Sequence, residues 1–200
     1  MRAGLAPLNP TRYFARVSAI NEKTLPPNLY IAGFMGTGKS AIGRRLAELE
    51  RLRFIDSDDA ITRLAGKSVA KIFAEEGETE FRRMEREFVE GGHPARGCVV
   101  ALGGGLVTQP GIIEALRAKG VLVCLIASVE SILQRTRGNR ARPLLNVADP
   151  EARVRDLLAE REPYYKRAGT CIMTDGRPLS DLVAHLDRIY RREAKNYPAK

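Results

Sequence analysis

Short apolar runs alternate with amphipathic stretches along the chain from residue 28 onward. The runs are almost continuously apolar, as is typical of strands buried on both faces of a parallel sheet; they cover residues 29–33, 53–56, 98–104, 120–127 and 170–174. The stretches between them repeat apolar residues at helical spacing. They predict helices over residues 39–50, 110–118, 128–137, 150–168 and 179–194. Residues 57–91 predict two or three further helices, interrupted near Gly66 and Gly77.

Two local details refine this pattern. Ile42, Leu46 and Leu49 recur on one face of the first helix and are expected to be buried together. Ser128 is the expected N-cap of the helix that follows the fourth strand, because a serine hydroxyl can accept a hydrogen bond from the first helical turn.

The alternation of strands and helices predicts an α/β fold with a five-stranded parallel sheet flanked by helices. The chain has 200 residues, enough for one domain with its own hydrophobic core. Its longest apolar run, residues 121–127, is much shorter than the roughly 20 residues that cross a membrane. We therefore expect one folded domain over residues 28–200 and no membrane partner.

Residues 1–27 differ from the rest of the chain. They contain four prolines, four basic residues and one acid, without apolar periodicity. This composition weakly resembles an organelle transit peptide but lacks its serine richness, and no apolar segment of a secretory signal is present. We interpret the segment as a loosely ordered N-terminal extension of a cytoplasmic protein.

The chain carries 33 basic and 24 acidic side chains, a formal net charge of +9. Such a charge suits anionic partners of any kind, from nucleic acids to small phosphates and carboxylates. No basic stripe is interleaved with aromatic residues, so no nucleic-acid partner is expected. Cys98, Cys124 and Cys171 each lie in an apolar stretch and form no CxxC motif, which predicts reduced core thiols. The two histidines lack metal-ligand spacing.

The sequence GFMGTGKS at residues 33–40 lies between the first predicted strand and the first predicted helix. It fits the phosphate-binding pattern G-x-x-x-x-G-K-[ST], whose glycines let backbone N–H groups turn toward a bound phosphate. The N-terminus of the helix adds partial positive charge. We expect Lys39 to reach the β- and γ-phosphates of ATP or GTP, and the Ser40 hydroxyl to bind Mg²⁺.

Two carboxylates follow the second predicted strand directly, Asp56 and Asp58. In an extended segment, residues two apart point the same way, so both carboxylates could face one site. One could hold the water shell of Mg²⁺ while the other accepts a hydrogen bond from an attacking hydroxyl.

Three further motifs indicate an anionic, partly apolar acceptor. Phe81, Arg82 and Glu85 share one helical face by their spacing. Three glycines at residues 103–105 suit a place where a ligand presses against the main chain. The polar, arginine-rich residues 137–150 are suited to a lid that closes over the phosphates. Arg161 stands just before Pro163 on the helix that follows this lid.

In this order, GFMGTGKS, FIDSD, EFRRME, LGGGLVT, RPLL and REPYY resemble shikimate kinases over roughly residues 29–200. The phosphate loop is shared by many families, whereas the combination of the other motifs is quite specific. The resemblance implies a P-loop NTPase fold of the nucleoside-monophosphate-kinase type with a mobile lid. It implies MgATP-dependent phosphorylation of the 3-hydroxyl of shikimate, on the route to chorismate and the aromatic amino acids. One catalytic domain without an appended interface favours a monomer.

For the acceptor, the resemblance implies that Asp58 holds the reacting hydroxyl. It implies that Arg82 and Arg161 clamp the carboxylate of shikimate, a role that suits the planar guanidinium fork. Glu85 is implied to orient the arginine on the substrate side. The residues implied to line the acceptor pocket are Phe73, Phe81, Gly103, Gly104 and Gly105.

For the nucleotide, the resemblance implies that Asp56 lies near the Mg²⁺ shell together with Ser40. It places Arg142 of the lid near the phosphates and Arg135 against the adenine, with Arg177 or Pro178 closing the adenine side. The expected ATP contacts are Gly36, Thr37, Gly38, Lys39, Ser40, Ala41, Arg135, Arg142 and Arg177. The expected catalytic residues are Lys39, Asp58 and Arg142.

The sequence is also compatible with other functions. A gluconate kinase also takes an anionic sugar acid, but the pairing of Arg82 and Arg161 with three glycines favours shikimate. A nucleoside-monophosphate kinase would need a base-stacking site and more arginines facing phosphate. A basic nucleic-acid-binding ATPase would match the net charge, and an inactive structural relative would keep the fold alone.

Overall fold

The computed structural model describes residues 25–137, 147 and 149–197. Most of the predicted extension at residues 1–27 lies outside the described residues. The greater part of the predicted lid, including Arg142, also lies outside them.

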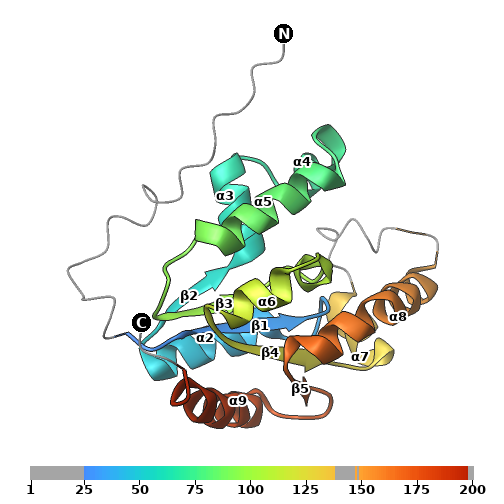
Figure 1. The fold of residues 1–200 in the computed structure, drawn as a ribbon. Coiled ribbons are helices and arrows are strands. Elements are labelled where there is room, and N and C mark those ends of the chain that lie inside the picture. Colours follow the sequence, from blue (N-terminus) through green and yellow to red (C-terminus); the bar gives the residue numbers. More distant parts are fainter. Residues whose placement is uncertain (1–24, 138–146, 148, 198–200) are drawn as a thin grey trace.

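Five parallel strands form one sheet in the order β2-β3-β1-β4-β5 (Figure 1). The strands are β1 (Asn28–Gly33), β2 (Arg53–Asp56), β3 (Cys98–Ala101), β4 (Gly120–Ile126) and β5 (Thr170–Met173). From central β1 the chain first builds the β2–β3 side of the sheet and then crosses to β4 on the other side. Ligands of open α/β sheets bind at the carboxyl ends of strands beside such a switch point. The phosphate loop follows β1 at this position.

Helices cover both faces of this sheet. The helices are α2 (Lys39–Glu50), α3 (Ser57–Ala65), α4 (Val69–Glu75), α5 (Glu78–Gly91), α6 (Ile112–Arg117), α7 (Val129–Thr136), α8 (Pro150–Ala168) and α9 (Leu179–Ala194). Helices α2 and α9 pack against each other on one face, while α6 and α8 cover the other. Helices α3, α4 and α5 lie together beside the β2 edge (Figure 1). They connect β2 to β3 and carry the motifs expected to bind the acceptor.

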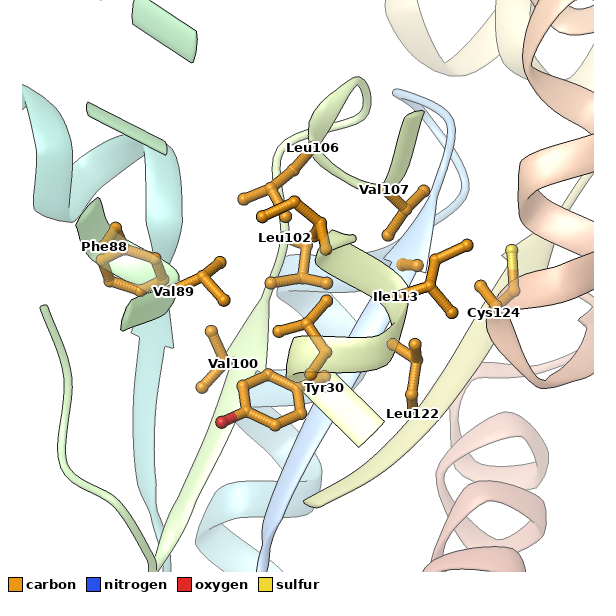
Figure 2. Close-up of a cluster of buried hydrophobic side chains, with 14 of the residues drawn as sticks. Tyr30, Phe88, Val89, Val100, Leu102, Leu106, Val107, Ile113, Leu122 and Cys124 are labelled. Carbon is orange, nitrogen blue, oxygen red and sulfur yellow. The ribbon is translucent and has the colours of Figure 1, made fainter. Parts of the chain in front are cut away.

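The core is divided by the sheet into two clusters. Leu29 and Ile31 of β1 point into the cluster under α2 and α9, whereas Tyr30 and Ala32 point into the cluster under α5, α6 and α8. This alternation follows from the two-residue period of a strand. Figure 2 shows the second cluster, in which Tyr30 meets side chains from the neighbouring strands and from helix α6. A central strand buried on both faces gives the phosphate loop a rigid base.

The predicted elements are all present, with changes at some ends. Ser128 caps α7 as predicted, since its hydroxyl accepts a hydrogen bond from the Ser131 N–H at 3.2 Å. The third strand ends at Ala101 rather than residue 104, because the glycines that follow turn away from the sheet. Helix α6 begins at Ile112 rather than residue 110, since Pro110 precedes Gly111, which has a φ of 78°.

The expected burial of Leu49 is wrong. The buried face of α2 consists of Ile42, Gly43, Leu46 and Ala47, and Leu49 lies at its margin with 55% of its surface exposed. Gly43 lies within this face and leaves room for the Phe54 ring of β2, because a Cβ at residue 43 would lie 2.8 Å from that ring. The sheet therefore covers the arc of α2 around Gly43 and leaves Leu49 at its margin.

The expectation of three core thiols is also wrong in part. Cys98 and Cys124 are buried, but Cys171 is exposed. Cys171 belongs to β5, which is the edge strand and buries only Ile172 of its residues. An apolar run at the edge of a sheet therefore does not imply burial of each of its members.

The end of the predicted extension contacts the domain. The carbonyl of Pro26 accepts a hydrogen bond from the Gly97 N–H at 2.9 Å. The Tyr190 hydroxyl of α9 donates to the carbonyl of Pro27 at 2.7 Å. Among the described residues, no helix combines the length and apolar character needed to span a bilayer.

Leu46 and Leu49 provide a matched test of this packing. Leu46 is fully buried, so Leu46→Ala is expected to lower the free energy of unfolding by about 2–5 kcal/mol. Leu49→Ala is expected to change it by less than about 0.5 kcal/mol. Urea denaturation of both variants measures the difference, and equal losses would contradict the described orientation of α2.

Candidate active site

The phosphate loop takes the conformation that its glycines permit. Gly33, Gly36 and Gly38 have φ angles of 135°, 78° and 91°, in the region that favours glycine. At Gly33 a Cβ would lie 2.2 Å from the carbonyl oxygen of Leu125, so no other residue fits without a shift of β4. The loop then opens into the N-terminus of α2, where backbone N–H groups and the helix dipole favour an anion.

Two side chains of the loop hold its own backbone. The hydroxyl of Thr37 and the ammonium of Lys39 both donate to the carbonyl oxygen of Phe34, at 2.8 and 2.9 Å. Lys39 therefore lies across the loop. A lysine in this position can donate to phosphate oxygens that enter the same space.

Ser40 and Asp56 meet although they are 16 residues apart. The Ser40 hydroxyl donates to Asp56 Oδ2 at 2.7 Å. Oxygen ligands of this kind suit Mg²⁺, which keeps several waters and uses one or two protein groups together with substrate phosphates. Within the described part of the chain, no group of three or more potential metal-ligating histidines, cysteines or acids occurs.

The two aspartates are arranged differently from the expectation. Asp56 ends β2, but Asp58 lies in the first turn of α3 rather than in an extended segment. Asp56 Oδ1 accepts a hydrogen bond from the Asp58 N–H at 3.1 Å and thereby caps α3. Asp56 therefore caps α3 through one oxygen and accepts the hydrogen bond from Ser40 through the other.

Asp58 and Glu85 face the same point from two helices. A Cβ on Gly103 would lie 2.6 Å from Asp58 Oδ1 and 2.9 Å from Glu85 Oε1. Both oxygens are shielded from solvent and have no hydrogen-bond partner among the described residues. Burial raises the pKa of both groups: the charge of Asp56 adds to the effect at Asp58, and Glu85 reaches about 7 despite the nearby Arg82 guanidinium. Two buried acceptors without donors are ready to accept hydrogen bonds from a polyhydroxylated ligand.

Each of the three glycines at residues 103–105, here called the glycine segment, lies against a different group. Gly103 faces the two carboxylates, and a Cβ on Gly105 would lie 2.8 Å from both terminal nitrogens of Arg82. A Cβ on Gly104 would lie 3.6 Å from Arg161 Nη1 and 3.7 Å from the Met35 nitrogen. The sequence predicts glycines here for the sake of the ligand. In the structure the protein's own side chains already crowd a Cβ at residues 103 and 105, whereas a Cβ on Gly104 would make only ordinary van der Waals contacts.

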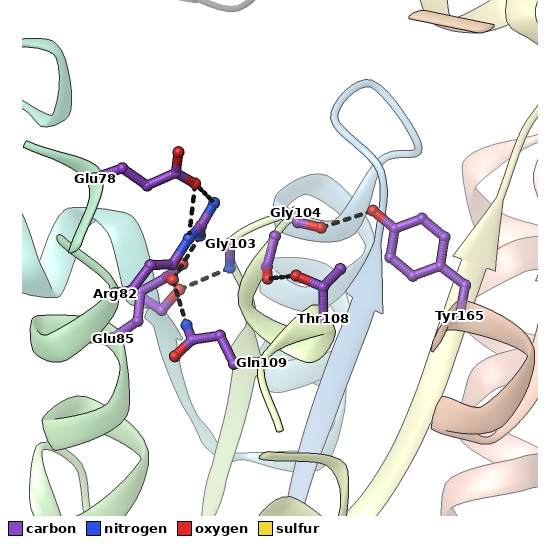
Figure 3. A network of polar contacts seen from close by, with 10 residues as sticks. Glu78, Arg82, Glu85, Gly103, Gly104, Thr108, Gln109 and Tyr165 are labelled. Atoms are coloured by element: carbon purple, nitrogen blue, oxygen red, sulfur yellow. Dashed lines mark hydrogen bonds and ion pairs between the residues drawn. The ribbon is translucent and has the colours of Figure 1, made fainter. Parts of the chain in front are cut away.

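Arg82 is held by carboxylates on its own helix. It donates to Glu78 Oε1 through Nε at 3.2 Å and Nη2 at 2.9 Å, and to Glu85 Oε2 through Nη1 at 2.7 Å (Figure 3). The predicted proximity of Arg82 and Glu85 on one helical face is therefore present. The guanidinium plane is fixed above Gly105.

Arg161 approaches the glycine segment from the opposite side, on α8. Its side chain is buried, with 7% of its surface exposed, and its guanidinium lies 5.7 Å from the centre of the Phe34 ring. The hydroxyl of Tyr165, one turn later, donates to the Gly104 carbonyl at 2.7 Å (Figure 3). The two predicted clamp arginines thus reach the same backbone segment from α5 and α8.

Two aromatic rings lie beside this region. The ring centres of Phe73 and Phe81 are 4.9 Å apart, and Phe81 is 4% exposed. They connect α4 to α5 and form an apolar wall next to Arg82.

The residues predicted on the adenine side form a second group. Arg135 of α7 donates to the Gly36 carbonyl at 3.2 Å and to Thr174 Oγ1 at 3.0 Å. Arg177 lies further along the loop after β5, where its guanidinium donates to the carbonyls of Met173 and Asp181. Ala41 is exposed in the first turn of α2. Arg135 thus connects the phosphate loop to the loop after β5. Arg142, the remaining residue predicted to contact ATP, lies outside the described residues.

Arg161 and the phosphate loop both lie near Gly104. A phosphate cradle near two arginines and two carboxylate oxygens that have no partner among the described residues is typical of a P-loop kinase that acts on a small anionic molecule. Such a kinase needs few groups beyond those that position the two substrates and neutralise their charge.

Comparison with known proteins narrows this class to one family. A family model described as shikimate kinase matches residues 35–189. A shikimate kinase of Caldanaerobacter subterraneus subsp. tengcongensis is 40% identical over 163 residues, 82% of this chain and 95% of the relative. The solved structure of a shikimate kinase from Acinetobacter baumannii in complex with shikimate is 38% identical, with a TM-score of 0.78 over 85% of this chain and 95% of that one. The chain belongs to the shikimate kinase family, whose members are ATP-dependent kinases, as its motifs predicted.

The alternative of a gluconate kinase is less well supported. A gluconokinase of Sinorhizobium meliloti covers 86% of this chain with a TM-score of 0.59 but is only 18% identical. That likeness shows a common fold alone.

Three residues that contact the site were not predicted. The Ser57 hydroxyl accepts a hydrogen bond from the Gly103 N–H at 2.8 Å, Tyr165 donates to Gly104, and Gln109 donates to Glu85. Ser57 lies between the two predicted aspartates and Tyr165 lies within the REPYY motif, so their positions gave a weak signal. Nothing in the sequence indicates Gln109.

The close approach of Arg82 to Gly105 predicts a functional rather than a structural effect of a small side chain. Gly105→Ala is expected to push the guanidinium aside and raise the KM for shikimate about tenfold or more, with little change in Tm, because only the end of a flexible side chain must move. Gly91→Ala on α5, which has open space, is the matched control. An unchanged KM would contradict the described position of Arg82.

Glu85 predicts a specific pH dependence of stability. Its pKa is about 7 in the folded chain and about 4.5 ordinarily, so between these values the folded state binds more protons than the unfolded state. Its contribution therefore makes the free energy of unfolding fall as pH rises through this window, by up to about 1.4 kcal/mol per pH unit. Glu85→Gln is expected to flatten this fall in urea unfolding measured from pH 4.5 to 7. Glu78→Gln, exposed on the same helix, should keep the slope of the parent; a parent-like slope in Glu85→Gln would refute the assignment.

Proposed function

We propose that the chain transfers the γ-phosphoryl group of MgATP to the 3-hydroxyl of shikimate. The observation that carries this proposal is the position of Gly104. A Cβ on Gly104 would lie 3.6 Å from Arg161 Nη1 and 3.7 Å from both the Gly33 carbonyl oxygen and the Met35 nitrogen of the phosphate loop, so a carboxylate bound by Arg161 and a phosphate chain bound by the loop would lie close together. The A. baumannii relative, solved with shikimate, supports the choice of acceptor.

Arg82 and Arg161 would clamp the carboxylate of shikimate from α5 and α8. A guanidinium fork matches a carboxylate with two parallel hydrogen bonds, and Arg161 is desolvated, which strengthens such a contact. Phe73 and Phe81 would cover the apolar side of the ring. Glu85 would orient Arg82, and Gly103, Gly104 and Gly105 would allow the ring to approach the main chain.

Asp58 would hold the reacting hydroxyl. Its Oδ1 is shielded from solvent without a partner, and its raised pKa makes the carboxylate a better proton acceptor than an ordinary aspartate. An oriented hydroxyl needs little more than a hydrogen bond to a fixed acceptor, because phosphoryl transfer depends mainly on position and charge neutralisation.

The donor side would be held by the phosphate loop. Lys39 would leave the Phe34 carbonyl for the phosphates, and the N–H groups of the loop and first helical turn would surround them. Mg²⁺ bound near Ser40 and Asp56 would neutralise charge on the phosphates. The residues proposed to contact ATP are Gly36, Thr37, Gly38, Lys39, Ser40, Ala41, Arg135 and Arg177, with Arg142 as the lid residue.

We further propose a cytoplasmic monomer that has no nucleic-acid partner. The kinase domain would comprise residues 28–200, with the lid at about 137–150. The residues proposed for the acceptor and for the donor all belong to one chain, which supports a monomer.

Release of ADP from MgATP tests the proposed reaction. We expect rapid release with shikimate, and little with gluconate or without an acceptor. The methyl ester of shikimate keeps the 3-hydroxyl but lacks the negative charge, so its KM should be about 10- to 100-fold higher if the two arginines bind the carboxylate.

Lys39→Ala is the control, because it should abolish release under all conditions. Equal KM values for shikimate and its ester would refute the clamp. ADP release with gluconate would show that gluconate, rather than shikimate, is the acceptor. ADP release without any acceptor would indicate an ATPase instead.

A further inference from the structure

One carboxylate oxygen at the acceptor site accepts hydrogen bonds from two different elements. Glu85 Oε2 accepts from Arg82 Nη1 at 2.7 Å and from Gln109 Nε2 at 2.7 Å (Figure 3). The Glu85 side chain is 1% exposed, so solvent cannot replace either donor. Because both donors occupy Oε2, the other oxygen, Oε1, is left to face Gly103 and Asp58.

Gln109 supplies what the contacts within α5 cannot. The bonds of Arg82 to Glu78 and Glu85 fix the guanidinium relative to its own helix only. Gln109 lies 24 residues after Glu85, close to the glycine segment. Its hydrogen bond to Glu85 fixes Arg82 and Glu85 of α5 relative to that segment. Under the proposed function the acceptor lies between these two elements, so their separation would set the space that it can occupy.

The backbone of Gln109 is itself fixed. Its N–H donates to the Leu106 carbonyl at 3.3 Å, and its carbonyl accepts from the Ile112 N–H at 3.3 Å. Pro110 follows and restricts its conformation further. The amide group therefore reaches Glu85 from a rigid base, as a positioning contact requires.

We propose that Gln109 is a positioning residue for the acceptor: through Glu85 it holds Arg82 against Gly105 and turns Glu85 Oε1 toward the bound ring. The inference rests on the proposed function, since it assigns Arg82 and Glu85 to the acceptor. It predicts that Gln109 governs the binding of shikimate and leaves the binding of ATP unchanged.

The charged groups around Glu85 determine how a variant would respond to pH. Arg82, with Glu78 behind it, comes from α5, Asp58 from α3 and Arg161 from α8. Above the Glu85 pKa of about 7, a carboxylate placed at residue 109 would repel the ionised Glu85 side chain. At acid pH, protonation of either group would restore a hydrogen bond between them.

Steady-state kinetics of two variants test the proposal. Gln109→Met keeps the length but loses the donor and is expected to raise the KM for shikimate about tenfold, with kcat and the KM for ATP within about twofold of the parent. Gln109→Glu should raise it further at pH 8 and recover toward the parent at pH 6, whereas Gln109→Met should not recover. A merely structural role would not produce this difference in pH profile.

Arg86→Met is the matched control. Arg86 donates from α5 to the Pro110 carbonyl at 3.2 Å, so it joins the same two elements without touching Glu85. We expect its KM for shikimate to be that of the parent. If Arg86→Met raised the KM for shikimate as much as Gln109→Met, the attachment of the loop to α5 would matter rather than the contact with Glu85. If Gln109→Met changed kcat, both KM values and Tm in parallel, it would have lost its fold. Either result would overturn the proposal.

A measurement without turnover separates this inference from the proposed function. Carboxyl NMR of glutamate-labelled protein, assigned with Glu85→Gln, gives the titration midpoint of Glu85. Loss of the amide donor in Gln109→Met is expected to raise this midpoint by about one pH unit, because the donor stabilises the ionised form. An unchanged midpoint would refute the contact, whereas a raised midpoint in a chain that does not phosphorylate shikimate would refute the function alone.

Discussion

The architecture of the site depends on space that three glycines leave free. The backbone of residues 103–105 passes between helices α5 and α8 and against the phosphate loop, and a Cβ would lie 2.6 Å from Asp58 Oδ1 at residue 103 and 2.8 Å from Arg82 Nη1 at residue 105. Around this segment the other elements are joined by single hydrogen bonds: Ser57 from α3 and Tyr165 from α8. The donor and acceptor sides therefore share one short piece of main chain, and their separation is set by backbone geometry rather than by long side chains.

This close packing has an electrostatic cost. Asp58 and Glu85 are brought together out of solvent, and burial raises the pKa of both. Arg82 and Lys39 offset part of this cost, but one oxygen of each carboxylate finds no donor within the part of the chain that the structure describes. A folded state that leaves them so is less stable than one with a satisfied or apolar pocket, and a ligand rich in hydroxyl groups would recover some of that stability on binding.

Most of the fold was predictable because strands and helices follow local periodicity, and the phosphate loop because its spacing is fixed by the phosphates that it binds. The exceptions were Leu49 and Cys171, whose exposure depends on which arc of a helix and which edge of a sheet the tertiary structure covers. Asp58 was predicted at the site, and residues 57–91 were predicted to be helical. The argument that both aspartates face one site, however, used the geometry of an extended segment, whereas Asp58 lies in the first turn of α3, which Asp56 caps. Gln109 could not be predicted, because its partner lies 24 residues away and the pairing exists only after α5 docks beside the glycines. The functional roles proposed for Asp58, Gln109 and Arg142 remain predictions.

The order of elements along the chain also bears on how such a kinase changes its substrate in evolution. Asp58, Phe73, Phe81, Arg82 and Glu85 all lie in the single excursion between β2 and β3, while the phosphate loop and Arg135 lie on either side of it. If these residues have the roles proposed for them, changes confined to one uninterrupted stretch of the gene would alter the acceptor and leave the nucleotide site intact. Arg161 and the glycine segment lie outside that stretch, so an exchanged acceptor would still have to offer an anion to α8 and a flat face to the main chain.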